Sequence, residues 1–394
     1  MKLLIVTILF TMACTGSSPS FSDFDRKARA GAKLNVVFFG ASLTWGANST
    51  DPNLTSYRAG TARALEQRYP RAHFKFWDAA IGGTGSQLAI FRLDRDVLSR
   101  RPDLVFLDFS ANDDIYSADT ETLSSYEAVV RKIISVGRAP VVQMLFPFAQ
   151  NIKAGELERM KRREAHLKIS LSYHTAVGDA IKLALERVRQ NPGELEELWP
   201  IDGSHPGDHG YALFAEAAME AFDNAVRRRL MCETPSRMIY GDTYTTATRA
   251  RISKLGELPS GWRVGTPNHT SAYFDMFMTR WLDDEVIASA ASRPEPLRVH
   301  FRASMVMLFG ESTPTSGGYT ARIDGHPVRP EMFEPGSFAR GASGNVHLVQ
   351  VLATGLDPAV THTLEIEPLF RAGSEEELRL ESICVAGGAA TVWK

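Results

Sequence analysis

Three residues that could together attack an acyl carbonyl occur in this chain at informative positions. Ser42 lies in Gly-Ala-Ser-Leu-Thr at 40–44, and His205 lies three residues after Asp202 in a loop rich in glycine and proline. A serine hydroxyl becomes a nucleophile when an imidazole takes its proton. A carboxylate beside the ring fixes its tautomer and stabilises its charged form. Ser42, His205 and Asp202 are therefore a candidate triad.

Each member also has a plainer explanation. A serine after a strand is often only a turn former, and Asp202 or Ser204 could make local turn bonds in a solvated loop. His209 is a competing base, but it falls in the first turn of a predicted helix, so His205 is preferred.

Two further loops offer hydrogen-bond donors for the negative charge that develops on an attacked carbonyl oxygen. Gly-Gly-Thr-Gly at 82–85 exposes backbone N–H groups, and it has neither the lysine nor the spacing of a phosphate-binding loop. Asn112 lies three residues after the apolar run at 104–109, where its amide could point at an oxyanion or could cap the next helix.

The segments around these loops alternate between strand and helix patterns. Strands are expected at 34–39, 73–77, 104–109 and 140–146, and helices at 56–69, 86–99, 120–137, 155–190 (broken near 177–178) and 208–230. This alternation predicts a parallel sheet covered by helices on both faces. Such sheets bind ligands at the carboxyl ends of their strands, where Ser42 and Asn112 fall.

The pattern changes after residue 230. Short apolar runs separated by Gly, Pro, Ser and Asp occur at 297–301, 305–309, 319–323, 346–352, 363–366 and 378–385, and one short helix is expected near 272–282. Many short strands with frequent turns predict a β-sandwich or jelly roll. Since 394 residues exceed what one core sustains, we expect a leader and tether at 1–20, a catalytic domain at 30–230, a linker at 231–242 and a smaller all-β accessory domain at 243–394.

The first twenty residues are typical of an export signal. A positive start precedes an apolar run at 3–10 that is too short to span a bilayer. Thr-Met-Ala-Cys at 11–14, followed by a polar tether, resembles a bacterial lipoprotein signal, so Cys14 is a lipidation candidate. The alternative is a cleaved signal that removes Cys14. We therefore expect either a periplasmic or cell-envelope lipoprotein or a secreted protein, attached to a membrane only through a lipid on Cys14.

The remaining cysteines and two tryptophans each allow two interpretations. In an oxidising compartment Cys232 and Cys384 would form a disulfide, and otherwise they are two small buried hydrophobes. Trp45 and Trp199 could line a substrate pocket or simply pack. The formal net charge of −2 argues against a nucleic-acid partner, and the sequence does not indicate an oligomeric state.

Together, the four loops at 40–44, 81–84, 111–113 and 202–205 resemble, in order and spacing, the signature blocks of the SGNH hydrolase (GDSL esterase/lipase) superfamily. The resemblance implies a flavodoxin-like three-layer αβα fold and a hydrolase without metal or cofactor. It also implies an oxyanion hole made by the Ser42 N–H, the Gly83 N–H and the Asn112 side chain. Ala41 stands where the family usually has Asp, and Asp78 where Asn is common; neither position attacks or transfers a proton.

We therefore predict an exported serine esterase that hydrolyses O-acyl, preferentially O-acetyl, esters of a small molecule or a polysaccharide. Export, the attached β-rich domain and the lack of an apolar lid-like helix favour a carbohydrate over a lipid. The alternatives are a lipase, lysophospholipase or thioesterase with the same triad, and a non-catalytic surface protein that binds glycans.

Overall fold

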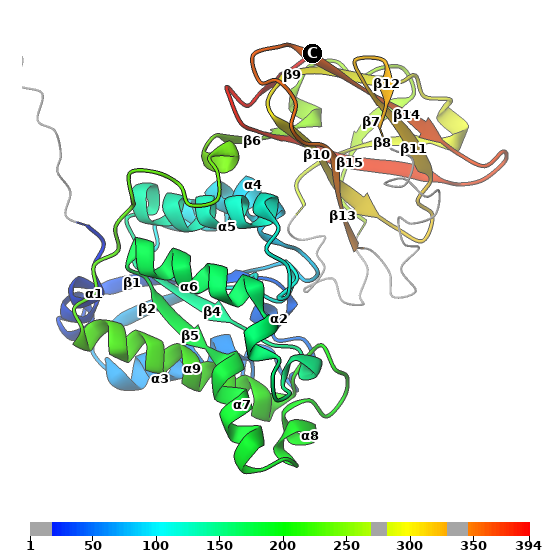
Figure 1. Ribbon diagram of the computed structural model, residues 1–394. Coiled ribbons are helices and arrows are strands. Elements are labelled where there is room, and N and C mark those ends of the chain that lie inside the picture. Colours follow the sequence, from blue (N-terminus) through cyan, green and yellow to red (C-terminus); the bar gives the residue numbers. More distant parts are fainter. Residues whose placement is uncertain (1–17, 269–281, 329–345) are drawn as a thin grey trace, which may run out of the picture.

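The computed structural model describes residues 18–268, 282–328 and 346–394 (Figure 1). Cys14 with most of the predicted leader, and nearly all of the predicted helix at 272–282, lie outside the described residues. In the described ranges, no helix combines the length and the apolar character that crossing a bilayer requires.

The first half of the chain forms a five-stranded parallel sheet in the order β2-β1-β3-β4-β5. The strands are β1 (Lys33–Gly40), β2 (His73–Ala80), β3 (Leu104–Leu107), β4 (Val141–Leu145) and β5 (Ala176–Asp179). The sequence predicted the first four. It missed β5, because this strand has four residues, Ala-Val-Gly-Asp, between two helical patterns, so the predicted helix at 155–190 is in fact a helix, a strand and a second helix.

Helices cover both faces of this sheet, as predicted (Figure 1). α4, α5 and α6 pack in series on one face, and α1, α3 and α7 contact α9 on the other. Their bounds are α1 (Phe21–Arg29), α2 (Ser42–Trp45), α3 (Tyr57–Arg68), α4 (Ser86–Asp96), α5 (Thr120–Lys132), α6 (Lys161–Tyr173), α7 (Ala180–Gln190), α8 (Glu194–Leu198) and α9 (Asp208–Arg227). The sequence did not predict α1, whose Phe21 and Phe24 are buried in the common core.

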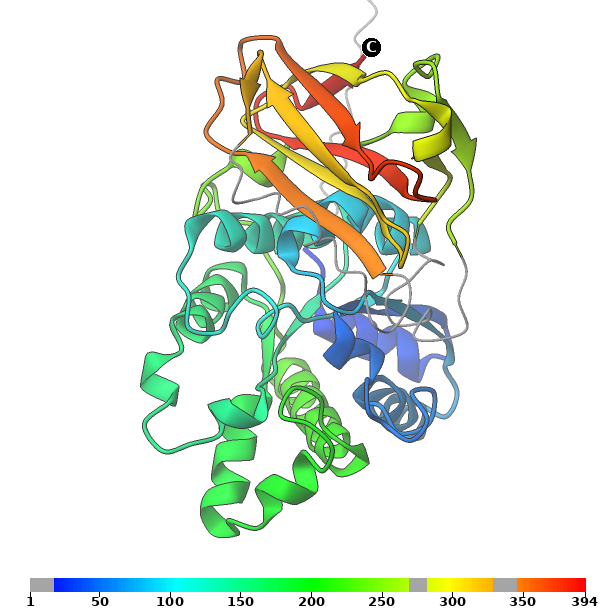
Figure 2. The same cartoon turned by 90° about the vertical axis from the view of Figure 1, so that its right-hand side faces the viewer.

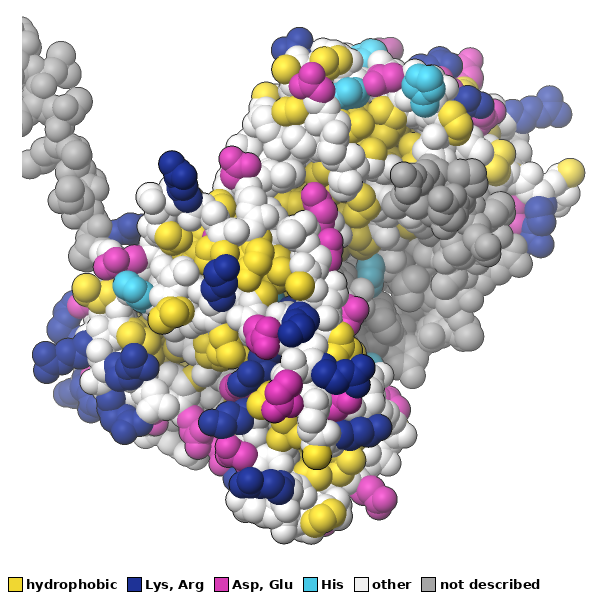
Figure 3. Space-filling model, in the orientation of Figure 1, with side chains coloured by type: hydrophobic (Ala, Val, Ile, Leu, Met, Phe, Trp, Pro, Cys, Tyr) yellow, Lys and Arg dark blue, Asp and Glu magenta, His cyan; other side chains and the backbone are white. Residues whose placement is uncertain are grey.

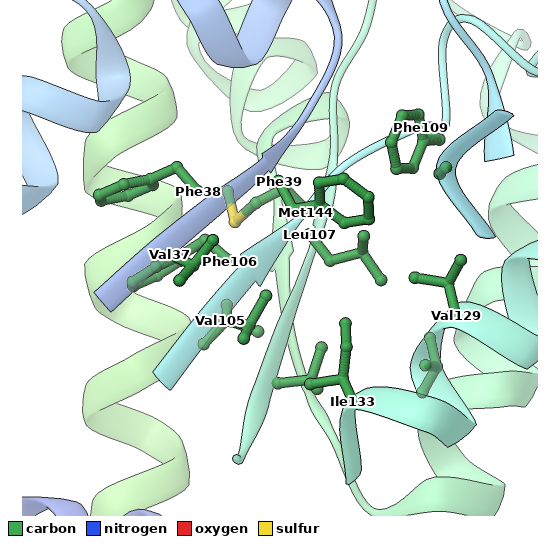
Figure 4. Packing of buried hydrophobic residues seen from close by; sticks show 14 of the residues in the cluster. Val37, Phe38, Phe39, Val105, Phe106, Leu107, Phe109, Val129, Ile133 and Met144 are labelled. Atoms are coloured by element: carbon green, nitrogen blue, oxygen red, sulfur yellow. The ribbon is translucent and has the colours of Figure 1, made fainter. Parts of the chain in front are cut away.

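Large apolar side chains fill the space between the sheet and its helices (Figure 4). Phe38 of β1 stacks on Phe106 of β3 with ring centroids 5.1 Å apart, and Phe39 meets Phe109 edge to face at 5.4 Å. Consecutive residues of β1 are buried because helices cover both faces of a parallel sheet. This explains why β1 reads as a continuous apolar run rather than as an alternating one.

The second half is all-β, as predicted, and consists of two antiparallel sheets packed face to face (Figure 2). One sheet has the order β13-β10-β15-β8-β7, with β6 also pairing with β15, and the other has the order β12-β11-β14-β9-β16. The strands are β6 (Ala247–Arg251), β7 (Trp262–Gly265), β8 (Glu285–Ser289), β9 (Leu297–Arg302), β10 (Met305–Ser312), β11 (Gly318–Ile323), β12 (His326–Pro327), β13 (Val346–Ala353), β14 (His362–Leu369), β15 (Glu377–Ala386) and β16 (Thr391–Trp393).

The segment that joins the two halves is hydrogen-bonded along α5. The buried carboxylate of Glu127 accepts the backbone N–H groups of Ile239 and Tyr240, both at 2.9 Å to its Oε2. Further on, Tyr244 packs edge to face on Phe91 of α4, and its hydroxyl donates to Glu121 at 3.0 Å. The two halves are therefore joined through side chains of α4 and α5, not only through the covalent chain.

The predicted disulfide between Cys232 and Cys384 is wrong, because both cysteines are free and buried. The Cys232 thiol lies at 3.4 Å from the carbonyl of His174, just before β5. Cys384 lies in β15, between Met307 of β10 and Arg249 of β6. Burial raises the pKa of both thiols, that of Cys232 to about 12, so each is an inert small apolar group.

Candidate active site

The nucleophile turn begins where β1 ends at Gly40. A side chain at this position is excluded, because a Cβ would lie 2.1 Å from the Thr44 hydroxyl and 2.8 Å from the Asp108 carbonyl. The chain therefore turns sharply and places Ser42, 6% exposed, at the first position of the short helix α2. Arg58 holds the end of this helix by donating to the carbonyls of Thr44 at 2.8 Å and Trp45 at 2.9 Å.

The structure brings His205 to Ser42. The His205 Nε2 lies 3.0 Å from the Ser42 Oγ, which is a hydrogen-bond distance. On the other side of the ring, Nδ1 lies 3.6 Å from the Asp202 Oδ2. The competing base, His209, points elsewhere: its Nε2 lies 3.5 Å from Glu194 of α8. Of the two histidines, His205 is thus the one placed to take a proton from Ser42.

Asp202 is held by more than the histidine. Its Oδ1 accepts the backbone N–H groups of Ser204 at 2.7 Å and His205 at 2.8 Å, and its Oδ2 accepts the Asn48 amide at 2.7 Å. Burial raises the pKa of Asp202, but the His205 backbone, Asn48 and the Ser204 backbone outweigh that effect and leave the pKa below its ordinary value. The carboxylate is therefore ionised at neutral pH.

Asn48 is a site residue that the sequence analysis missed. Its backbone is left-handed, with φ +67°, which turns the loop after α2 back toward Asp202. The loop is fixed at two further points, since Tyr211 donates to the Ala47 carbonyl at 2.7 Å and Asp208 accepts the Thr50 N–H at 2.7 Å. The only sequence signal at this position is that asparagine adopts left-handed backbone more readily than most residues. That preference does not reveal a hydrogen-bond partner 154 residues away.

The predicted oxyanion donors sit on the two loops that flank the Ser42 loop. β1 lies between β2 and β3, so Gly83 after β2 and Asn112 after β3 follow its immediate neighbours. Asp113 joins these loops by accepting the Ser86 N–H at 2.9 Å, and a Cβ at Gly85 would lie 2.2 Å from the same carboxylate. In the described part of the chain, the Asn112 Oδ1 is buried without a hydrogen-bond partner, so the acceptor end of this amide is not bound to another residue.

Two buried carboxyl groups lie beneath these loops. Burial raises the pKa of Asp108 to about 7, although Ser110 donates its N–H and its hydroxyl to Oδ1, both at 3.1 Å. Burial likewise raises the pKa of Asp113 to about 6, against the lowering effect of Ser86 and Arg162. Neither carboxyl group contacts Ser42 or His205 by any interaction in the described residues, so we assign them to loop structure rather than to proton transfer.

The two predicted pocket tryptophans differ in their surroundings. Trp199 is 7% exposed and packs edge to face on Phe214 at 6.3 Å, so it has little surface to offer a ligand. Trp45 is half-buried at the end of α2, close to the nucleophile in the chain. The structure therefore favours packing for Trp199, and of the two tryptophans it leaves only Trp45 with surface next to Ser42.

Asp78, which stands where the family commonly has Asn, interacts with the arginine that holds the end of α2. Its carboxylate lies 3.7 Å from the Arg58 guanidinium.

The site opens directly on the protein surface. The side chain of His205 is 24% exposed and that of Asp202 is 44% exposed, whereas Ser42 is nearly covered. An attacking serine at the base of an open rim can receive a small acyl group while a bulky alcohol part stays outside. The geometry thus leaves His205 and Asp202 accessible to a substrate from the solvent.

Comparison with known proteins agrees with this geometry. Residues 38–213 match the model of the GDSL-like Lipase/Acylhydrolase family. A crystal structure of a two-domain esterase active on acetylated mannans, with mannopentaose, superimposes with a TM-score of 0.72 over 94% of this chain and 95% of the other, at 22% identity. The acetyl xylan esterase AlAXEase is 21% identical over 48% of this chain and 99% of its own, with a TM-score of 0.40. No curated protein matches the chain.

Residues 38–213 form a GDSL-like acylhydrolase domain. The resemblance to the GDSL esterase/lipase group is thereby confirmed for these residues, and it supports a carboxylic ester hydrolase. The two-domain likeness extends the shared fold beyond this acylhydrolase domain and into the β-sandwich.

Replacing Asn48 tests how the acylhydrolase domain orients its acid. Asn48→Gly removes the amide and leaves a residue that tolerates positive φ. We expect kcat on a soluble acetyl ester to fall about tenfold, the lower end of the range for a hydrogen bond to a charged group. Asn53→Gly, in the same loop but with an exposed side chain, is the matched control. Equal kcat values for the two variants would contradict a role for Asn48.

The raised pKa of Asp108 should make the free energy of unfolding depend on pH. Its folded-state pKa of about 7 lies above the unfolded value of about 3.9, so the folded state binds the proton more tightly. This contribution to stability is present below about pH 4 and is lost as the pH rises to about 7. Asp108→Asn mimics the protonated form, so the free energy of unfolding of the variant, relative to wild type, should be larger at about pH 8 than at about pH 5.

Urea unfolding at both pH values measures that difference. Asp94→Asn removes an exposed carboxylate of α4 and is the control. If the free energies of unfolding of Asp108→Asn and wild type differed by the same amount at both pH values, Asp108 would be ionised over that whole pH range.

Proposed function

We propose that this protein is an exported serine esterase that removes O-acetyl groups from a carbohydrate. The observation that carries the proposal is the 3.0 Å contact between the Ser42 Oγ and the His205 Nε2 at the open carboxyl edge of the sheet. In the proposal, Ser42 is the nucleophile, His205 the general base and Asp202 the orienting acid.

The reaction follows from these positions. The Ser42 oxygen forms a bond to the acyl carbon while its proton passes to the His205 Nε2. The carbonyl oxygen becomes an oxyanion, and in the proposal the Ser42 N–H, the Gly83 N–H and the Asn112 amide stabilise it. The bond to the alcohol then breaks, and His205 returns the proton to the leaving oxygen. A water molecule, deprotonated by His205, attacks the acyl-serine and releases the acid and free Ser42.

Three features support a carbohydrate as the alcohol part. The exposed rim at His205 and Asp202 leaves room for a chain of sugars outside the site. The two-domain esterase of the same overall fold acts on acetylated mannans, although at 22% identity this likeness establishes the fold and not the substrate. The half-buried ring of Trp45 could offer an aromatic face to a sugar.

Export is part of the proposal. The apolar run at 3–10 and the Cys14 motif support it, and they fit a substrate outside the cytoplasm. Whether Cys14 carries a lipid or leaves with the signal decides between a cell-envelope lipoprotein and a secreted protein. Intact mass of the protein isolated from its envelope fraction measures this directly.

Replacing the proposed nucleophile and the oxyanion donor gives a first test. Ser42→Ala should abolish nearly all turnover of an acetyl ester, and Asn112→Ala should reduce kcat by about 10²–10³ through the lost oxyanion bond. Ser204→Ala, in the triad loop but with an exposed side chain, should retain activity and is the control. Near wild-type turnover by a clean preparation of Ser42→Ala would refute the assignment.

The acyl group is tested with acetyl, butyryl and octanoyl esters of one alcohol. A site built for acetyl groups should lose on the order of 1–3 kcal/mol of transition-state binding for each methylene that does not fit. We therefore expect kcat/KM to fall steeply along the series, and acetate to be released from acetylated polysaccharides. A maximum at octanoyl would support a lipase instead, and no turnover of any ester would support the non-catalytic glycan-binding alternative.

A further inference from the structure

Cationic side chains gather at the amino edge of the catalytic sheet, opposite the edge that carries Ser42. The segments leading into the strands contribute to this basic edge, and α9 ends on three consecutive arginines. The exposed members are Lys33 at the start of β1, Arg71 before β2, Arg101 before β3, Arg138 before β4, and Arg227, Arg228 and Arg229. In Figure 3 dark blue side chains are concentrated at the lower left, below the point where the described chain begins.

The positive charge of the basic edge is only partly neutralised. Its aspartates pair with other cations of the same edge: Asp23 with Arg26, Asp25 with Arg29, Asp103 with Lys27 and Asp223 with Arg68. By contrast, in the described ranges no carboxylate lies within ion-pair distance of Lys33, Arg71, Arg101, Arg228 or Arg229. The edge is thus net positive in a chain whose formal charge is −2.

Contacts across the basic edge show that it is one continuous surface. Arg71 of the β2 side donates to the carbonyl of Arg29 at the end of α1. Lys27 of α1 reaches Asp103 before β3 at 3.4 Å. One shallow hollow is lined by Ser18, Lys27 and Arg138, among other residues of this edge. Segments far apart in the sequence therefore present their charges together.

The N-terminal segment joins the body of the protein at this same surface. The Cys232 N–H donates to the Pro19 carbonyl at 2.8 Å, and the Phe21 N–H donates to the Leu230 carbonyl at 3.1 Å, next to the three arginines. Ser20 is only six positions after Cys14, and six extended residues span at most about 20 Å. An attachment at Cys14 would hold the basic edge within that distance of a membrane.

We infer that the basic edge binds the anionic headgroup surface of a phospholipid membrane and directs the active site away from it. Cations within about a Debye length, roughly 8 Å, of such a surface are attracted to it. Each of them strengthens binding about fivefold. Charge of this kind supplements a lipid chain, which alone binds reversibly. The inference depends on surface charge and not on the proposed esterase activity.

Vesicle binding of the full chain tests this inference. Cys14→Ser is introduced throughout, so that no lipid can be attached at this position. Sedimentation with phosphatidylcholine vesicles is compared with sedimentation with vesicles that also contain phosphatidylglycerol, at about 0.05 M and about 0.5 M salt. We expect tighter binding to the anionic vesicles at low salt and loss of that difference at high salt. The comparison with neutral vesicles subtracts any binding through the apolar leader.

Matched variants locate the surface. Lys33, Arg101, Arg228 and Arg229, whose side chains make no hydrogen bond in the described residues, are replaced together by Gln. The control replaces four exposed arginines of the β-sandwich by Gln: Arg263, Arg298, Arg302 and Arg322. The edge variant should lose at least roughly tenfold in partitioning to anionic vesicles, and the control less than about twofold. Unchanged melting temperature and esterase turnover would show that both variants fold.

Three results would overturn the inference. The first is equal binding of the wild-type chain to neutral and anionic vesicles. The second is equal loss of vesicle binding in the edge variant and the control. The third is an edge variant that loses binding to an acidic polysaccharide while its vesicle binding is unchanged, which would assign the surface to a soluble polyanion.

Discussion

The active site depends on how three adjacent parallel strands end. The hydrogen-bonded ladder continues to the last residue before each loop: the Ile81 N–H donates to Gly40 at 3.1 Å, and the Asp108 N–H donates to Phe39 at 2.9 Å. Buried Arg92 then joins the ends of β1 and β2 by donating to the Gly40 carbonyl at 2.9 Å and the Ala79 carbonyl at 2.7 Å. These contacts fix the starting points of the loops that carry Ser42, Gly83 and Asn112.

Arg92 can serve this purpose because its own charge is compensated. Burial lowers its pKa to about 10, so it remains charged at neutral pH, and Asp96 accepts its Nη1 at 3.0 Å one turn along α4. Its guanidinium also lies over the Phe39 ring, 4.4 Å from the centroid. A buried cation that satisfies two strand-end carbonyls holds them more firmly than water would, since water could be displaced by substrate. The rigidity needed beneath the nucleophile is thus supplied by groups that take no part in the reaction.

Much of this arrangement was predictable from the sequence, because the local signals were strong. The apolar runs of β1, β3 and β4 and the stripe of α9 predicted a parallel α/β sheet, and motif spacing indicated Ser42, Asp202, His205, Gly83 and Asn112. The interactions that orient those groups were not predictable. The hydrogen bonds of Asn48 to Asp202, of Ser86 to Asp113 and of Arg92 to Gly40 form only in the tertiary fold. A sequence pattern does not indicate pairs of residues so far apart in the chain.

The errors have the same origin. β5 is too short and too weakly apolar to be recognised without its neighbour β4, which supplies its hydrogen bonds. Cys232 and Cys384 were paired on the expected compartment and on their number, whereas a disulfide also requires Cα atoms within about 7 Å of each other. In the structure the two thiols are instead buried separately, Cys232 against the His174 carbonyl and Cys384 in β15. Composition indicates which groups are available, but only the packing decides which of them meet.

The contact between the two halves also depends on a buried charged group whose hydrogen-bond partners stabilise it, as Asp96 does for Arg92. The Glu127 carboxylate is fully buried on α5, and its partners are the Tyr173 hydroxyl and the N–H groups of Ile239 and Tyr240. A buried charge deprived of such partners is strongly destabilising, so the joining segment cannot detach from α5 without a large cost. Met307 and Phe309 of β10 share one hydrophobic core with α4 and α5. The β-sandwich therefore packs against the helices of the acylhydrolase domain through apolar side chains as well as through the hydrogen bonds of the joining segment.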